Sequence, residues 1–212
     1  IPLDGRPVWL DYNIRGWLSG INTAFANNKN NNNYFGSQLN YDWGFQNSLY
    51  NGNIAGVQWR TKGSDVQRAY GFGYDNTNQL LFADFNQNYN AAWGKTAAGG
   101  AINLTALIGN GTDGATAYDN NGNVKKLQQW GLKIGSSPQI DNLQYSYNIS
   151  NLSNKLSAVT EDDTIADKDN KLDDFTDGNR SGNDYAYDVN GNLIQDKNKK
   201  ITSITYNHLD LP

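Results

Sequence analysis

The clearest hydrophobic pattern in the chain spans residues 185–196. Tyr185 and Tyr187 alternate with small or polar residues, which is the periodicity of a β-strand. Asn190-Gly191 follows closely, and both residues tolerate positive φ, so the pair predicts a tight type I′ turn. Leu193-Ile194 then begins a return strand. The pattern predicts a β-hairpin within about twelve residues.

The same wording recurs along the chain. Residues 118–124 read Tyr-Asp-Asn-Asn-Gly-Asn-Val, and residues 74–80 repeat this string with Asn78 in place of the glycine. Weaker copies begin at Tyr147 and Tyr12. The main repeat positions are Tyr74, Asp75, Tyr118, Asp119, Gly122, Asn123, Tyr147, Tyr187, Asp188, Gly191, Asn192 and Leu193. A recurring hairpin unit predicts a repeat architecture, in which each unit buries its face against its neighbours.

Other segments give weaker signals. Further strand patterns cover residues 8–12, 14–18, 35–43, 53–60, 67–74, 80–85, 124–127, 140–149, 155–160 and 201–206. The tract 22–33 is too rich in Asn to pack, so we expect an exposed loop. Residues 86–98 fit helical spacing at Tyr89, Ala92 and Trp93, whereas 99–117 favours no single state.

Composition supports an all-β fold. Asn is the most frequent residue, Gly is next, and the chain has 13 Tyr and 6 Trp. Asn and Gly suit turns, while Tyr and Trp suit half-buried sheet surfaces. Leu and Ile are scarce for a conventional core. We therefore expect many short strands, with amphipathic aromatic side chains lining the faces of the sheet.

Charge and cysteine content exclude several classes of partner and chemistry. The net charge is −4, and nine acidic residues lie within 161–184. The sequence has no Lys/Arg-rich patch of the kind that nucleic acids and anionic membranes require. No apolar run approaches the roughly 18–20 residues of a membrane span. The absence of cysteine excludes disulfides, thiol catalysis and thiolate metal sites.

No catalytic constellation stands out, so we expect a non-enzymatic protein without a cofactor. His208 is the only histidine, and the chain lacks a Gly-x-Ser-x-Gly elbow. Asp pairs for glycoside hydrolysis are numerous, but nothing distinguishes one of them. The stretch from Asp167 begins like an EF-hand loop but has Leu172 in place of the required Gly and Gly178 in place of Glu. A looser carboxylate cage of Asp167, Asp169 and Asp173 stays open beside a solvated acidic loop.

The repeated Tyr-Asp-x-x-Gly-Asn-Leu wording resembles the YD repeats of bacterial RHS (rearrangement hotspot) proteins, and residues 184–212 resemble one subgroup of that family. The resemblance is firm over 70–212, which we expect to be one continuous repeat array. Residues 1–69, with the Asn-rich loop 22–33, would be a degenerate repeat or cap region. The family implies consecutive β-hairpins that form a long curved antiparallel sheet, part of a hollow shell.

The resemblance also implies a function. Such shells enclose a C-terminal toxin or effector domain of a secreted or surface-delivered bacterial protein, so this chain would be a structural wall segment cut from a longer protein. Its partners would be the rest of the shell, the enclosed domain and secretion machinery. The family's self-cleaving core is not recognisable in this sequence. An alternative reading is a carbohydrate-binding adhesin or lectin-like module, because Trp side chains can stack on glycans as well as line a sheet.

Overall fold

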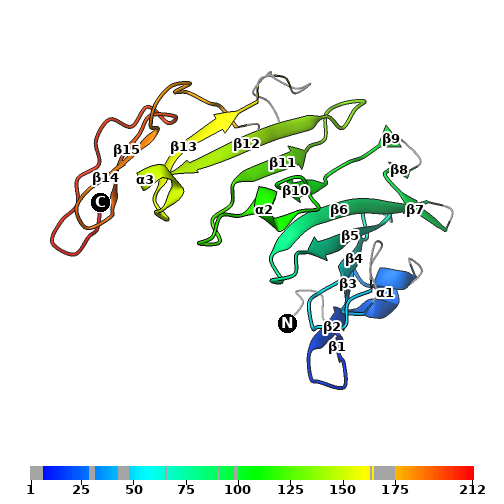
Figure 1. The fold of residues 1–212 in the computed structure, drawn as a ribbon. Helices are drawn as coiled ribbons and strands as arrows, with labels where there is room; N and C mark the ends of the chain where they lie inside the picture. Colours follow the sequence, from blue (N-terminus) through cyan, green and yellow to red (C-terminus); the bar gives the residue numbers. More distant parts are fainter. Residues whose placement is uncertain are drawn as a thin grey trace. The chain divides into compact units, whose positions relative to one another are not determined.

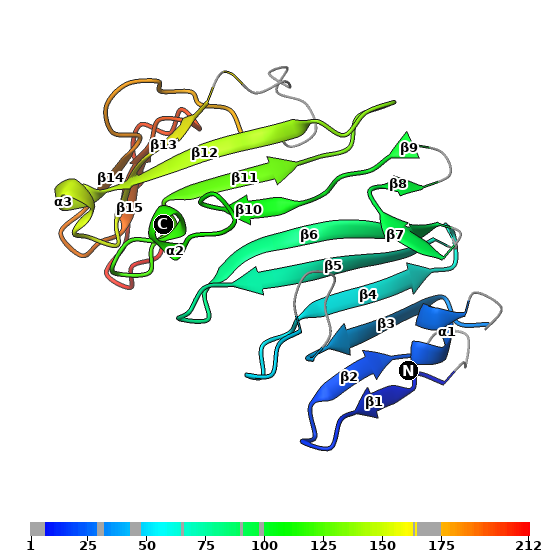
Figure 2. The same cartoon turned by 45° about the vertical axis from the view of Figure 1, so that its right-hand side comes forward.

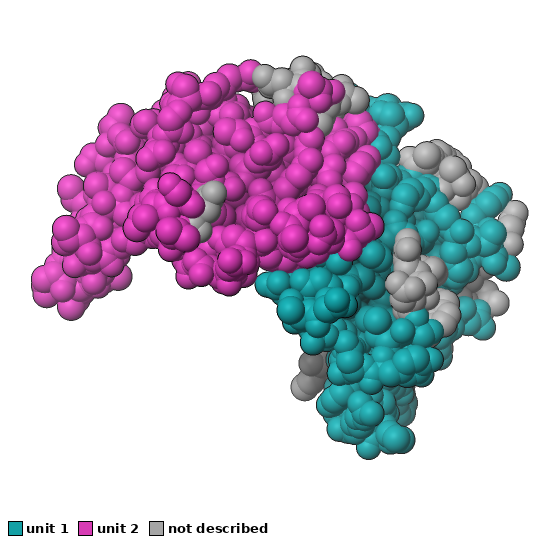
Figure 3. All heavy atoms as spheres, in the orientation of Figure 1, with its two compact units in different colours: residues 1–105, 132–137 teal, residues 106–131, 138–212 magenta. Residues whose placement is uncertain are grey.

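The computed structural model describes residues 7–28, 32–42, 48–64, 66–89, 91–97, 100–162, 164 and 175–212. Most of the regular structure in these residues is antiparallel β-sheet, and the described helices are short (Figure 1). The chain forms two compact units, 1–105 with 132–137 and 106–131 with 138–212 (Figure 3). The predicted all-β class is therefore confirmed.

Unit 1 is a meander in which each main strand pairs with the next along the chain. The described strands are β1 (Leu10–Tyr12), β2 (Leu18–Ile21), β3 (Phe35–Asn40), β4 (Gly56–Thr61), β5 (Gln67–Tyr74), β6 (Leu80–Tyr89), β7 (Ala92–Gly94), β8 (Thr96–Ala97) and β9 (Gly100–Ala101). Figure 2 shows β1 to β6 side by side in chain order. β7 pairs with β6, and β8 with β9. The predicted pairs at 35–43 with 53–60 and at 67–74 with 80–85 are confirmed.

One face of β4, β5 and β6 carries an aromatic cluster. The rings of Trp59 and Tyr70 stack with their centroids 5.6 Å apart, and Phe85 meets Tyr70 edge-on at 5.5 Å. The Phe85 side chain is fully buried. Alternation of side chains along a strand places these rings on the same face. Aromatic side chains therefore supply apolar burial here, as the composition predicted.

On the opposite face, α1 (Thr23–Asn27) packs against β3 and β4, and this corrects the prediction of an exposed loop over residues 22–33. Phe25 and Ala26 are fully buried. A side chain at Gly36 would bring its Cβ within 2.6 Å of the Ala26 nitrogen, so glycine lets the helix lie directly on β3. Residues 29–31 of the predicted loop lie outside the described residues.

The sequence did not predict this helix because its Asn-rich composition suggested exposure to solvent. In the structure, amide side chains instead form hydrogen bonds with backbone groups and with one another. Asn22 accepts a hydrogen bond from the Trp9 backbone nitrogen at 2.9 Å and donates to the Phe35 carbonyl at 3.0 Å. Gln58 donates to both Asn27 (2.9 Å) and Gln38 (2.8 Å). A buried polar side chain is tolerated when its hydrogen bonds are satisfied. The tract therefore packs despite its polarity.

Unit 2 is a second meander followed by a separate hairpin. Its elements are β10 (Ala106–Ile108), α2 (Gly114–Ala117), β11 (Lys126–Trp130), β12 (Gln139–Tyr147), α3 (Asn148–Asn151), β13 (Leu156–Glu161), β14 (Tyr185–Tyr187) and β15 (Leu193–Asp196). β10 to β13 pair in chain order, and β14 pairs with β15. The hairpin is attached to β13 through Asp184, whose buried carboxylate accepts from the Val159 nitrogen at 2.7 Å.

Several local predictions were wrong. The strand expected over 14–18 is mainly a turn, and only Leu18 enters β2. The helical spacing in 86–98 is part of a hairpin, since β6 continues to Tyr89 and β7 follows. The strand over 140–149 ends at Tyr147, and Ile149 has a φ of 56° and is 75% exposed. The predicted strand over 201–206 forms only one bridge, between Ile201 and Asp196.

Candidate functional site

The repeat motif forms a particular hairpin turn, seen most clearly at Asp188. The Asp188 Oδ1 atom accepts hydrogen bonds from the backbone nitrogens of Asn190 at 2.9 Å and Asn192 at 2.8 Å. The Gly191 nitrogen donates to the Asp188 carbonyl at 3.1 Å, and the Asp188 nitrogen donates to the Asn192 carbonyl at 2.9 Å. One aspartate thereby closes a five-residue loop through its backbone and side chain. We call this arrangement the Asx hairpin turn.

The same turn occurs five times among the described residues. The first residue is always Asp or Asn, and the fourth residue always has a φ between 55° and 94°. The five copies cover residues 13–17, 75–79, 119–123, 188–192 and 207–211. Their fourth residues are Gly16, Asn78, Gly122, Gly191 and Asp210. The copies at 13–17 and 207–211 show that Asn can replace Asp in the first position.

This geometry corrects the predicted type I′ turn at Asn190-Gly191. A type I′ turn requires positive φ at both central residues, but here Gly191 has a φ of 94° while Asn190 keeps an ordinary negative φ. The loop spans three residues between its closing pair, with a turn followed by one left-handed residue. The Asp188 side chain selects this form, because its carboxylate needs the nitrogens two and four residues ahead to converge on one oxygen.

Three of the turn carboxylates are stabilised in their charged form. Hydrogen bonds from the Gln79 and Thr77 backbone lower the pKa of Asp75 from its ordinary value of 3.8, despite some desolvation. At Asp119 and Asp188, desolvation favours the neutral acid. The hydrogen bonds from the turn outweigh it, so the pKa of each is also lowered. These aspartates therefore act as fixed acceptors for the turn.

Motif tyrosines make a second recurring contact, which joins one hairpin to an earlier one. The Tyr187 hydroxyl donates to the Leu156 carbonyl at 2.9 Å, and Leu156 is the first residue of β13. The Tyr74 hydroxyl donates in the same way to the Ile54 carbonyl at 2.9 Å. We call this contact the tyrosine tie. It connects different hairpins, whereas the Asx hairpin turn acts within one.

Five tyrosine ties are described, with O···O distances of 2.8–2.9 Å. They join Tyr41 to Leu18, Tyr74 to Ile54, Tyr147 to Val124, Tyr187 to Leu156 and Tyr206 to Leu193. In four ties the accepting residue comes two positions after a glycine of positive φ: Gly16, Gly52, Gly122 or Gly191. Burial raises the pKa of Tyr74, Tyr147 and Tyr187 above the ordinary value of 10.0. Each of these hydroxyls therefore stays a donor up to high pH.

Asparagine side chains link neighbouring turns. The Asn53 Nδ2 atom donates to Asn78 Oδ1 at 2.9 Å, and the Asn192 Nδ2 atom donates to Asp210 Oδ1 at 3.0 Å. In both pairs the acceptor is the residue of positive φ in the next Asx hairpin turn. The asparagine that follows the motif glycine thus has a structural role between repeats, in addition to its place in the turn.

Two motif copies depart from this scheme. Tyr147 keeps its tie, but the following residues form α3 and a wider loop that the Asn148 nitrogen closes onto the Lys155 carbonyl at 2.9 Å. Tyr118 comes directly before the complete Asx hairpin turn at 119–123, but the element before it is α2 rather than a strand, and Tyr118 pairs with Val124 in an isolated bridge. The return strand here is β11, which begins two residues later than predicted.

Sequence reasoning located the main residues of three of the five turns, and it missed the turn at 207–211, two of the tyrosines and all the accepting carbonyls. Tyr41 and Tyr206 are each followed by Asp or Asn, so a search for any Tyr-Asx pair would have found them. The accepting residues carry no signal in side-chain type, since only their backbone takes part. In four of the five ties the acceptor lies two positions after a glycine of positive φ, a regularity that the structure makes visible.

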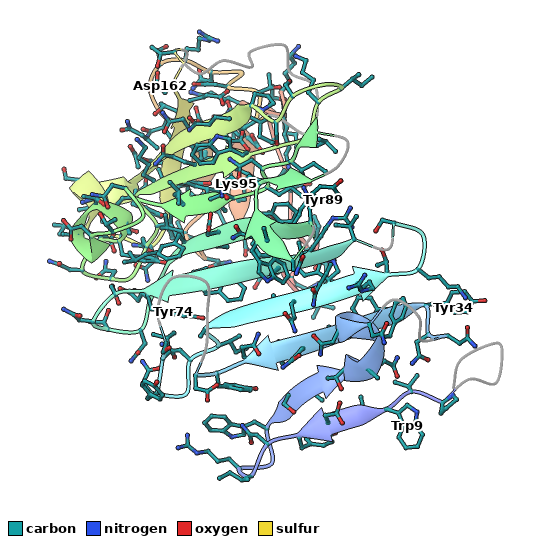
Figure 4. The ribbon with its side chains drawn as sticks, turned by 90° about the vertical axis from the view of Figure 1, so that its right-hand side faces the viewer. Trp9, Tyr34, Tyr74, Tyr89, Lys95 and Asp162 are labelled. Carbon is teal, nitrogen blue, oxygen red and sulfur yellow. The ribbon has the colours of Figure 1, made fainter. Side chains whose placement is uncertain are left out.

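Among the described residues, Lys95, Asp84 and Thr105 form a polar cluster whose side-chain types also occur in catalytic sites. Lys95 Nζ lies 2.5 Å from Asp84 Oδ1 and 3.1 Å from Thr105 Oγ1, and the Thr105 hydroxyl accepts from the Phe85 nitrogen at 3.2 Å. Figure 4 labels Lys95 where it meets the sheet. Thr105 is buried. This cluster links Lys95 and Thr105 to Asp84 and Phe85 of β6, and we interpret it as a structural contact.

The remaining chemical candidates add no reactive centre in the described part of the chain. His208 is exposed, in the second position of the Asx hairpin turn at 207–211. No group of three or more His, Cys, Asp or Glu side chains in the described ranges is arranged to hold a metal ion. The suggested carboxylate cage of Asp167, Asp169 and Asp173 lies outside those ranges.

Comparison with known proteins found no matching family model, no matching curated protein and no matching solved structure. None of the described helices is both long enough and apolar enough to cross a membrane.

Proposed function

We propose that the chain is a structural, non-enzymatic segment of a wall built from β-hairpin repeats. The tyrosine tie is the observation that carries this proposal. Each tie joins a tyrosine of one hairpin to the backbone of an earlier hairpin, 13 to 31 residues away. In a repeat array, stability comes largely from contacts between neighbouring units. A hydrogen bond that recurs between units therefore suits a scaffold.

The resemblance to the YD repeats of bacterial RHS proteins extends the proposal to a cellular role. In this role the hairpins form part of a hollow shell, which encloses a C-terminal toxin or effector domain. The partners are the rest of the shell, the enclosed domain and secretion machinery, and the location is secreted or at the cell surface. The support is the Tyr-Asp wording of the motif, together with a turn whose aspartate and glycine are each used structurally.

A protease-protection experiment on the whole gene product that contains this chain would test the enclosing role. We expect the enclosed C-terminal domain to resist protease in the intact product and to be digested when expressed alone. Replacing Tyr147, Tyr187 and Tyr206 together by Phe removes three ties of unit 2 and should speed digestion of the enclosed region. Tyr89→Phe is the matched control, because its side chain is 46% exposed. Equal digestion in the intact and isolated forms would refute the enclosing role.

A further inference from the structure

A cavity of about 390 Å³ lies in unit 1, beside the Asx hairpin turn at 13–17. Its lining comes from that turn, from the end of β3 and from the segments around Asp42 and Tyr50. This volume is within the usual range for small-ligand sites, roughly 300–1,000 Å³. None of the ties in unit 2 lines the cavity, so substitutions in those ties test the wall function separately from the cavity.

Aromatic rings form part of the cavity lining. Trp17 is held in place by Tyr41, whose ring centroid lies 5.2 Å away, and by Gly52, where an added Cβ would lie 3.1 Å from the indole. Tyr50 is different because its side chain is 80% exposed. The cavity therefore combines a fixed indole with a free phenol ring that a ligand could cover.

Polar groups around the same cavity have unused hydrogen-bonding capacity. The Arg15 guanidinium lies 5.1 Å from the centroid of the Trp17 ring, and its N–H groups have no hydrogen-bond partner among the described residues. Asp42 adds a carboxylate acceptor to the lining. The guanidinium of Arg15 and the carboxylate of Asp42 thus offer a donor group and an acceptor beside aromatic surface.

We propose that this cavity binds a saccharide. A pyranose ring has an apolar C–H face, which packs on an aromatic ring, and a rim of hydroxyl groups, which both donate and accept hydrogen bonds. Tyr50 would cover the apolar face. Arg15 would donate to ligand oxygens, and Asp42 would accept from a hydroxyl. This site gives the carbohydrate-binding alternative a specific location.

The chemistry of the cavity fits both neutral sugars and sugars that carry a carboxylate, because the Arg15 guanidinium can bind either a hydroxyl or a carboxylate. Screening the full chain on an array of neutral and acidic oligosaccharides would detect binding. Titration calorimetry with cellotetraose and tetragalacturonate as probes would then separate the two classes. A greater loss of tetragalacturonate binding than of cellotetraose binding in Arg15→Ala would assign the site to acidic sugars. An equal loss would assign it to neutral ones.

Tyr50→Ala is the decisive variant. Its exposed side chain makes little contribution to the fold, so the melting temperature should stay unchanged while affinity for the bound probe falls about tenfold. Tyr89→Ala, another exposed tyrosine of unit 1 (Figure 4), should leave affinity unchanged. No binding on the array, or equal binding by wild type and Tyr50→Ala, would overturn the proposal. The tyrosine-tie variants of unit 2 would still test the wall function separately.

Discussion

At the scale of single residues, the fold depends on a few positions whose backbone or side-chain chemistry admits little change. Each Asx hairpin turn contains two such positions. One is the left-handed residue, and the other is the aspartate or asparagine that begins the turn. Gly191 has a φ of 94°, a value that L side chains rarely adopt. Space is not the limit there, because an added Cβ would meet only the flexible end of Lys155, at 3.3 Å.

Replacing Gly191 by Val should therefore destabilise unit 2 through backbone strain. A β-branched residue in this region of φ should lower the free energy of unfolding by about 1–3 kcal/mol. His208→Ala serves as a control, because His208 is exposed and its side chain is not required by the turn, so the change should stay within about 0.5 kcal/mol. Urea melts of both variants check this. Equal melts would mean that the left-handed position is not limiting.

The turn aspartates predict a specific dependence on acid. The folded-state pKa values of Asp75, Asp119 and Asp188 are lowered below 3.8. Their ionised forms therefore add stability that is present above this ordinary value and is lost as the pH falls through the lower, folded-state values. Replacing all three by Asn should preserve the turns, since Asn13 and Asn207 already make the same hydrogen bonds.

Unfolding by urea at neutral pH and at several values below 3.8 would measure this effect. At neutral pH the triple Asn variant should be less stable than wild type, because hydrogen bonds to a charged acceptor are stronger than bonds to a neutral one. The difference should shrink in acid as the wild-type carboxylates become protonated. A difference that stays constant over the whole pH range would contradict the role assigned to the three aspartates.

At the scale of secondary-structure elements, the tyrosine tie sets how one hairpin meets another. Alternation along the strand already places each tyrosine on a face of its hairpin, and the tie fixes which backbone group it reaches. Tyr187 illustrates this, because its hydroxyl reaches Leu156 while the Lys155 ammonium lies 5.6 Å from its ring. The tie thus combines a hydrogen bond with side-chain packing at one junction between hairpins.

Replacing Tyr187 by Phe should cost about 0.5–1.5 kcal/mol, the typical net contribution of one hydrogen bond. The loss should be accompanied by faster amide exchange in β13 and β14, since the junction between them loosens. Tyr89→Phe is the control: it also removes a tyrosine hydroxyl, but at an exposed site, so it should have little effect on stability or amide exchange. If both variants exchange and unfold alike, the hydroxyl of Tyr187 has no role at the junction.

At the scale of the whole molecule, the strands of each unit follow one another in chain order. The first strand, β1, is an edge strand among the described strands. Among the described strands, β1 pairs only with β2, and all its residues are exposed. Trp9, just before β1, is 65% exposed, and Leu10 is 50% exposed. A strand edge with exposed apolar side chains can pair with another chain.

We therefore expect the isolated chain to self-associate as its concentration rises. Leu10→Lys should reduce association, because a charged residue on an edge strand opposes pairing. Ile134→Lys is the matched control, since Ile134 is fully exposed but lies in a turn outside the strands. Size-exclusion chromatography over a range of concentrations measures the outcome. A stable monomer for wild type at every concentration would show that this edge does not promote pairing.

The sequence alone determined the strand-rich class and most of the hairpins. Aromatic alternation in 67–74 and the Asp-x-x-Gly spacing at 188–191 reflect local preferences of strands and turns, which neighbouring residues can specify. The same preferences located the first residue and the left-handed residue of three of the five Asx hairpin turns. They could not distinguish a type I′ turn from the observed form, because that choice depends on which nitrogens the Asp188 carboxylate receives.

Only the tertiary structure decided the rest. Residues 22–28 pack as a helix because Asn22, Asn27, Gln38 and Gln58 satisfy one another or the backbone across several strands, and no local pattern encodes such partners. The tyrosine ties end on backbone carbonyls, which every residue type possesses, so composition could not indicate them. The cavity beside Trp17 likewise gathers residues from separate segments between Asn13 and Gly52. Contacts between distant residues are specified by the assembled sheet, and they become visible only when its register is known.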